Sequence, residues 1–160
     1  MSAMARHEDY LAQAIRLARE NVARGGRPFG AVLVKDGDIV ATGVNEIHAT
    51  SDPSAHAEMQ AIRSAAIARQ SPRLDGYVMY ASGNPCPMCM SLMHMIGIAE
   101  VYYAYSNEDG EPFNLSTAKI YAEMAKPFAQ QNMRIVHLPL REGEHLYESW
   151  RRASGAQASR

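Results

Sequence analysis

Strand-like and helix-like segments alternate along most of this 160-residue sequence, and this alternation restricts the possible folds more than any other feature. Apolar residues recur at helical spacing from His7 to Val22, and Gly25-Gly26 then ends the run as a helix C-terminus should. Two β-rich runs follow and flank Lys35-Asp36-Gly37-Asp38. Because Asp-Gly between such runs is typical of a tight turn, we expect a β-hairpin here.

The rest of the sequence predicts a β-α-β unit followed by further alternation. A strand, an apolar helix and a second strand are expected to give parallel strands with a right-handed crossover. We therefore expect an α/β fold, a three-layer α/β/α sandwich with a mixed five-stranded sheet. The expected elements are a helix over 7–22, strands over 29–34 and 39–44, a helix beginning near His56, a strand over 77–81, a helix over 86–96, a strand over 100–105, a helix over 117–125, a strand over 134–138, and a final helix over 144–152 with Leu146, Tyr147 and Trp150 inward.

Length, charge and hydropathy point to one ordinary globular domain. We expect residues 1–160 to form a single domain with a structured core over about 7–152 and a frayed tail over 153–160. The net charge of -1 gives no general attraction to nucleic acid or anionic lipid, so a small substrate is favoured. Neither a signal peptide nor an apolar run of ~18 residues is recognisable. A cytoplasmic protein without membrane contact is therefore expected.

Two short motifs carry the residues suited to chemistry, and each stands where a helix is expected to begin. The first is His56-Ala57-Glu58, and the second is Cys86-Pro87-Met88-Cys89, which contains the only two cysteines. The i, i+3 spacing puts both sulfurs on one face of a first helical turn, whose positive end favours thiolates. His56 and Glu58 are ~200° apart around a regular helix, so they are poorly placed to bind one ion together. We predict that His56, Cys86 and Cys89 bind zinc and that Glu58 transfers protons.

Structural zinc sites use four protein ligands, whereas this sequence offers three. The fourth position of a tetrahedral zinc ion is therefore left for water. Zinc lowers the pKa of such a water to roughly 7. After Glu58 has taken its proton, the water can attack a ring carbon that bears an exocyclic amine, and ammonia then leaves. The pattern predicts a zinc-dependent hydrolytic deaminase of a small aminated heterocycle.

The same motifs resemble those of the cytidine deaminase superfamily, and within it the bacterial guanine deaminase-like branch. The resemblance spans about residues 7–152 and implies guanine or a related purine base as the substrate in purine metabolism. It also implies that Asn45 hydrogen-bonds the base, that Phe29 stacks near it and that the backbone of Ala57 contacts its edge. One zinc ion per subunit and a homodimer with exchanged C-terminal segments are further implications. The matching residues are Pro28-Phe29-Gly30-Ala31-Val32, Asn45, Asp52-Pro53-Ser54-Ala55-His56-Ala57-Glu58, Pro85-Cys86-Pro87-Met88-Cys89 and Tyr147 to Arg151.

The sequence departs from this branch where the purine's polar edge is bound. Leu115-Ser116-Thr117 stands where guanine deaminases carry an aspartate, and Asn84 replaces the usual glutamate before the Pro-Cys pair. Glu142 and Glu144 lie near a position where the resembling enzymes use a second acid in proton transfer. The residue that binds the polar edge of the substrate is therefore not identified by the motifs.

Several other interpretations remain open from the sequence. A deaminase of tRNA adenosine shares both motifs, although the net charge does not indicate a basic surface. Cytosine, a triazine or a pterin are alternative substrates. A non-catalytic dimeric zinc module would need a fourth protein ligand, with His48 and His94 the nearby candidates. The Cys-x-x-Cys pair alone is also compatible with a disulfide oxidoreductase.

Overall fold

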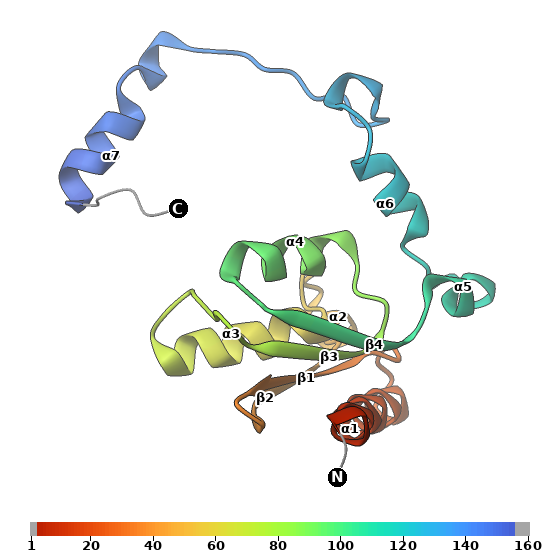
Figure 1. Ribbon diagram of the computed structural model, residues 1–160. Helices are drawn as coiled ribbons and strands as arrows, with labels where there is room; N and C mark the ends of the chain where they lie inside the picture. The colour runs from red at the N-terminus through yellow and green to blue at the C-terminus, as the bar shows by residue number, and fades with distance from the viewer. Residues whose placement is uncertain (1–2, 156–160) are drawn as a thin grey trace. The chain divides into compact units, whose positions relative to one another are not determined.

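A four-stranded mixed sheet forms the centre of the N-terminal part of the chain (Figure 1), as seen in a computed structural model that describes residues 3–155. The chain divides into two compact units, one ending at Ala125 and one beginning at Lys126, and the sheet belongs to the first. The strand order is β2-β1-β3-β4. β1 pairs antiparallel with both β2 and β3, whereas β3 and β4 are parallel. The strands are β1 (Gly30–Lys35), β2 (Asp38–Val44), β3 (Val78–Gly83) and β4 (Glu100–Tyr105).

Helices cover both faces of this sheet, which confirms the expected three-layer α/β/α sandwich. On one face α1 (Ala3–Ala23) packs through Ala14 against Val32 and Tyr80. On the other face α3 (Ala57–Arg69) and α4 (Pro87–Ile96) pack against Leu33 and Met79. Neighbouring residues of a strand point to opposite faces, so β1 contributes alternate side chains to two separate cores.

The predicted hairpin is confirmed and turns on two residues with positive φ. Asp36 has φ 51° and Gly37 has φ 85°, the left-handed pair that a two-residue turn of this type requires. The register between β1 and β2 shifts once, between Leu33 and Val34, which marks a bulge. A short helix, α2 (Ile47–Thr50), follows the hairpin and was not predicted.

One glycine allows α3 to lie directly against the sheet. A Cβ atom at Gly43 of β2 would stand 2.2 Å from the carbonyl oxygen of Ala57 and 2.8 Å from the backbone nitrogen of Ala61. Only hydrogen fits in that space. The contact fixes the first turn of α3 on the sheet, immediately after His56.

The first unit ends in short helices after β4. The capping box of Ser106 and Asp109 begins α5 (Asn107–Gly110), which leads into the 3-10 helix η1 (Glu111–Phe113). The helix predicted over 117–125 is confirmed as α6 (Ala118–Met124).

The second unit contains the 3-10 helices η2 (Phe128–Gln130) and η3 (Arg141–Gly143) and the helix α7 (Leu146–Ser154). The predicted strand over 134–138 is wrong, since no strand pairing involves it within residues 3–155, and the sheet has four strands rather than five. A strand needs a neighbour to satisfy its backbone, and a β-rich run cannot supply one by itself.

The final helix forms close to its predicted position, but its apolar side chains are not buried. Leu146, Tyr147 and Trp150 are 63%, 84% and 60% exposed, so the prediction that they point inward is wrong. Within residues 126–155 no side chain is buried, so this part of the second unit offers no core against which α7 could pack.

Three other expectations concern the chain as a whole. The single domain over 1–160 stays a prediction, as does the cytoplasmic location. Of the tail expected to fray over 153–160, Ala153 and Ser154 belong to α7, and residues 156–160 lie outside the described residues. Among the helices of residues 3–155, none is long and apolar enough to cross a membrane.

Candidate metal and catalytic site

Two helix starts bring one imidazole and two sulfurs together. His56 is the N-cap residue of α3, and Cys86 is the N-cap residue of α4, with Cys89 one turn later. The Sγ atom of Cys86 lies 3.4 Å from Nδ1 of His56, and that of Cys89 lies 3.8 Å from the same nitrogen. All three donor atoms are within 4.8 Å of one another.

This donor set fits zinc in both chemistry and spacing. Zinc takes imidazole nitrogen at about 2.0–2.1 Å and thiolate sulfur at about 2.3 Å, so tetrahedral angles place such a nitrogen and sulfur about 3.5 Å apart. The observed separations of 3.4 and 3.8 Å bracket this value. Both cysteines are free rather than joined in a disulfide. The three residues can therefore hold one zinc ion with little movement.

The two sulfurs differ in their tendency to ionise. Hydrogen bonds from Cys89 and His56 lower the pKa of Cys86 to about 4. The hydrogen bond between the two cysteines, together with burial, raises the pKa of Cys89. The hydrogen bond between His56 and Cys86 raises the pKa of His56. Cys86 is thus a thiolate near neutral pH, and a cation placed among these atoms favours the thiolate form of Cys89 as well.

A buried carboxyl group lies beside the sulfurs. Glu58, the second residue of α3, is 6% exposed, and its Oε2 accepts a hydrogen bond of 3.4 Å from the Cys89 thiol. Burial raises the pKa of Glu58, because the charged form loses its hydration. A carboxyl group with a raised pKa next to a metal position is suited to accepting and returning a proton.

The residues expected to contact a substrate lie on neighbouring segments. The backbone nitrogen of Asn45 donates to the carbonyl oxygen of Phe29 over 3.2 Å. Asn45 is buried, and its Oδ1 accepts from the backbone nitrogen of Ile47, which leaves the Nδ2 group to face another partner. Phe29 packs against the core cluster of α3 and α4, and Ala57 is fully buried at the start of α3.

Asn21 of α1 supports this region and was missed by sequence reasoning. Its Nδ2 donates to the carbonyl oxygens of Arg27 and Asn45, each over 2.8 Å, and the residue is 1% exposed. Both donors of the amide hold loop carbonyls, so Asn21 ties the loops before β1 and after β2 to α1. The available signal was an asparagine on the apolar face of an amphipathic helix.

A largely apolar cavity of about 650 Å³ lies on the α1 side of the sheet at the ends of β3 and β4. Phe29 and Asn84 line it, whereas His56, Cys86 and Cys89 do not. Its other walls come from Ile15, Ala18, Arg19, Val22, Pro28, Ser82, Gly83, Tyr105, Ser106, Asn107, Asp109, Gly110, Phe113 and Leu115.

The remaining candidate residues do not join the metal group. His48 and His94 are exposed, and the group found among residues 3–155 contains three side chains. Thr117 is held by Asn107, whose Oδ1 accepts from the Thr117 backbone nitrogen over 3.0 Å. Glu142 and Glu144 are exposed in the second unit.

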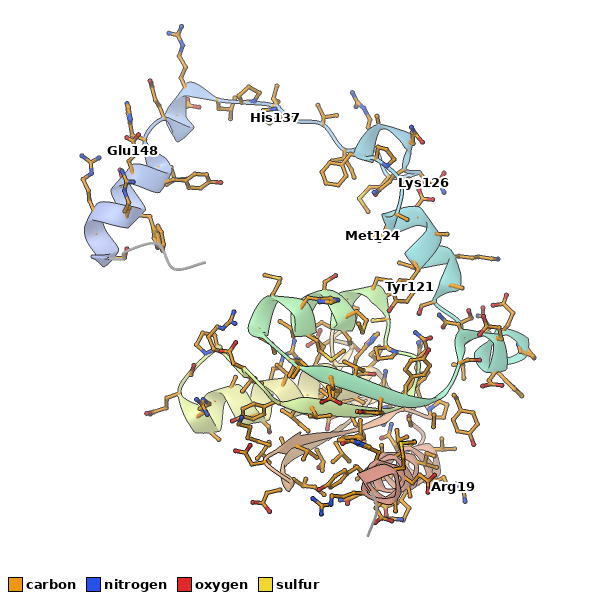
Figure 2. All side chains as sticks on the ribbon, viewed as in Figure 1. Arg19, Tyr121, Met124, Lys126, His137 and Glu148 are labelled. Carbon is orange, nitrogen blue, oxygen red and sulfur yellow. The ribbon has the colours of Figure 1, made fainter. Side chains whose placement is uncertain are left out.

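A tyrosine of α6 reaches the loop that carries Cys86, and the motifs gave no indication of it. The Tyr121 hydroxyl donates a hydrogen bond to the carbonyl oxygen of Pro85. Figure 2 labels Tyr121, whose side chain extends from α6 toward the start of α4. The two residues are 36 positions apart, so only the fold shows that they meet.

Comparisons with known proteins agree with this geometry. The family model of the cytidine and deoxycytidylate deaminase zinc-binding region matches residues 4–105. Guanine deaminase of Bacillus subtilis is 38% identical over 146 residues, covering 91% of this chain and 94% of that protein. The tRNA-specific adenosine deaminase of Aquifex aeolicus is 29% identical over 140 residues, covering 87% and 89%.

A solved structure extends the similarity to three dimensions. The X-ray structure of guanine deaminase from Bacillus subtilis superposes with a TM-score of 0.86 at 36% identity, covering 96% of this chain and 98% of that one. The matched region of the family model contains His56, Glu58, Cys86 and Cys89. The chain therefore belongs to the cytidine and deoxycytidylate deaminase family.

Proposed function

We propose that this protein is a zinc-dependent hydrolytic deaminase that releases ammonia from guanine or a related purine base. The observation that carries the proposal is the convergence of His56, Cys86 and Cys89 from two helix starts, with the buried carboxyl of Glu58 at 3.4 Å from Cys89. Similarity to the Bacillus subtilis guanine deaminase over nearly its whole length supports guanine as the first substrate to test.

His56, Cys86 and Cys89 would hold one zinc ion per subunit. When bound, zinc supplies the positive charge that makes water a nucleophile near neutral pH. Glu58 would accept one proton of the attacking water and pass it to the ring nitrogen. It would then take the proton of the newly formed hydroxyl group and pass it to the leaving amine. Its raised pKa lowers the cost of holding that proton in a buried place. Water adds to the ring carbon, the bond from that carbon to the exocyclic nitrogen breaks, and ammonia leaves.

The base would be oriented by residues that the fold holds rigidly. Asn45 would hydrogen-bond the base through its Nδ2 group, Phe29 would stack near it, and the backbone of Ala57 would contact its edge. The support lies in burial of Asn45 and Ala57 and in the packing of Phe29 against the core. Leu115-Ser116-Thr117 contains no carboxylate, so the polar edge of the base would be bound by neutral partners.

We expect ammonia release from guanine when the zinc-loaded protein is incubated with a panel of bases. The panel contains guanine, adenine, cytosine, ammeline, a pterin and the matching nucleosides. Glu58→Gln is the control: it should lose about 10²–10⁴-fold of the rate, the usual contribution of general acid–base catalysis, while keeping zinc. Substantial activity of Glu58→Gln would contradict the role given to this carboxyl.

The second candidate function is deamination of adenosine in tRNA. It is favoured by the similarity to the Aquifex aeolicus enzyme over 140 residues. The balanced charge of the chain speaks against a polyanionic substrate. Adding tRNA to the same panel, with inosine measured in the digested product, distinguishes the two functions: inosine without ammonia from free bases would replace the guanine proposal.

We also propose that the active protein is a homodimer with exchanged C-terminal segments. Support comes from the second unit, whose large apolar side chains Leu138, Tyr147 and Trp150 are 60–84% exposed. Exposed apolar side chains gathered on one segment mark an association surface.

A further inference from the structure

The carbonyl oxygen of Pro85 accepts two side-chain hydrogen bonds, although it is part of a short loop between β3 and α4. One comes from the Tyr121 hydroxyl of α6, and the other comes from Nδ2 of Asn84 over 3.0 Å. Pro85 is among the fully buried residues of the chain. Two donors on one loop carbonyl are more than backbone satisfaction requires, since one hydrogen bond is enough.

This carbonyl controls the position of Cys86. The ring of Pro85 fixes its φ angle, so rotation about the Cα–C bond of Pro85 is the main freedom left between Pro85 and Cys86. The same rotation turns the carbonyl oxygen and moves the Cα atom of Cys86. A hydrogen bond that holds the oxygen therefore holds Cys86 at the N-cap of α4, where its Sγ meets His56.

The helix α6, which carries Tyr121, is held at its N-terminus by a second set of hydrogen bonds. At the N-terminus of α6, the backbone nitrogen and hydroxyl of Thr117 donate to Oδ1 of Asn107 over 3.0 and 3.4 Å. None of the residues of α6 is fully buried. The hydrogen bond from Tyr121 to Pro85 is thus a specific polar attachment of an otherwise exposed helix to the loop that carries Cys86.

We propose that Tyr121 is a positioning residue: by holding the Pro85 carbonyl it fixes the sulfur of Cys86 for metal binding and couples α6 to the metal centre. This proposal rests on the zinc site of the proposed function, but not on which base is deaminated. Ser116 and Thr117, which stand where guanine deaminases carry an aspartate, directly precede α6. The hydrogen bond of Tyr121 therefore also connects this segment to the metal centre.

The test is the zinc affinity of Tyr121→Phe, measured by competition with a chromogenic chelator. Loss of an outer partner of a metal ligand costs about 10–100-fold in affinity, and we expect a weakening of at least about tenfold. Tyr103→Phe is the matched control, because Tyr103 of β4 is half exposed and lies near enough to affect Tyr121 electrostatically. Its zinc affinity should stay within twofold of the unmodified protein.

Hydrogen exchange of α6 provides a second measurement that a general loss of stability does not reproduce. Removal of zinc from the unmodified protein should speed exchange of the amides over 118–124, and this response should be lost in Tyr121→Phe. If Tyr121→Phe does not fold, Asn84→Ala removes the other donor to the same carbonyl and should likewise weaken zinc binding. Unchanged zinc affinity in a folded Tyr121→Phe protein overturns the proposal.

The outcome is separable from that of the proposed function. Tight zinc binding by the unmodified protein without release of ammonia from guanine contradicts the substrate and leaves the Tyr121 test valid. Absence of zinc binding by the unmodified protein contradicts both proposals.

Discussion

Glu58 combines two properties that oppose each other in a folded protein. Its position beside Cys89 suits proton transfer, but its burial removes the water that stabilises a carboxylate. The folded chain therefore holds a group whose usual ionised state is unfavourable there. If Glu58 has the proposed role in proton transfer, the protein retains it at a cost in stability.

Replacement of Glu58 by Gln should therefore stabilise the metal-free protein at alkaline pH. Burial raises the pKa of the folded carboxyl above its unfolded value, so the folded state binds the proton more tightly. The free energy of unfolding of the unmodified protein consequently falls as pH rises from below the unfolded pKa through the folded pKa. We expect Glu58→Gln to be more stable by about 1–3 kcal/mol at pH 8, the range for an uncompensated buried polar group.

The measurement is thermal unfolding of both chelator-treated proteins between pH 5 and pH 8. The difference in Tm should shrink as pH falls, because the raised pKa lets the unmodified carboxyl take up its proton in the folded state. Equal melting temperatures at pH 8 would show that Glu58 is not destabilised by its surroundings.

Among single residues, the sequence predicted those that belong to a recognisable motif. It missed those that reach the site region only through contacts made in the fold. His56, Cys86 and Cys89 were expected together because their two motifs stand at helix starts, and the structure places their donor atoms within 4.8 Å of one another. Asn21 and Tyr121 carry no motif. Their partners are backbone carbonyls, which every residue has, so their roles depend on contacts over 6–36 positions.

Among the elements, α3 depends on the close approach that Gly43 allows. Its N-cap is His56, so a displacement of the helix also moves an imidazole of the candidate metal site. The close approach at Gly43 is therefore one of the contacts that link the sheet to the candidate metal site.

Gly43→Ala is expected to destabilise the protein and to weaken zinc binding. The added methyl group would meet backbone atoms of α3 at 2.2 and 2.8 Å, and backbone cannot rotate aside as a side chain can. Overpacking of this kind costs about 1–3 kcal/mol or more. Denaturant unfolding and chelator competition measure the two effects.

Gly143→Ala is the matched control, because no atom lies within 4 Å of its Cβ position. The control should change the free energy of unfolding by less than about 0.5 kcal/mol, as surface substitutions usually do. Equal effects of the two substitutions would contradict the steric explanation.

Elements with a strong local pattern were predicted well, and elements that need a distant partner were not. The hairpin was identified by Asp-Gly, and the helices by apolar spacing. The run over 134–138 has strand composition, yet within residues 3–155 it has no strand beside it. Which strand becomes a neighbour is a property of the assembled sheet and not of the run itself.

The described residues form one unit with a large buried core and a second, over 126–155, in which no side chain is buried. The buried residues of both core clusters lie within residues 14–96, whereas the second unit exposes most of its large apolar side chains. Such a segment gains stability only by associating with another surface.

The proposed homodimer predicts a molar mass of about twice 17.6 kDa for the full chain in size-exclusion chromatography with light scattering. A chain that ends at Ala125 lacks the exposed second unit and should elute as a monomer. It should still bind zinc, because its metal group lies within residues 56–89. A monomeric full chain at micromolar concentration would contradict the dimer.

The candidate metal ligands are far apart in the sequence, so the amount of folded protein should depend on the supply of zinc. Thirty positions separate His56 from Cys86, so an ion held between them acts as a reversible cross-link that the unfolded chain cannot form well. Free ion at 100 times its dissociation constant adds about 2.7 kcal/mol to the folded state. If the proposed zinc site is correct, a cell short of zinc should hold fewer molecules of this protein, because the less stable metal-free form would unfold and be degraded sooner.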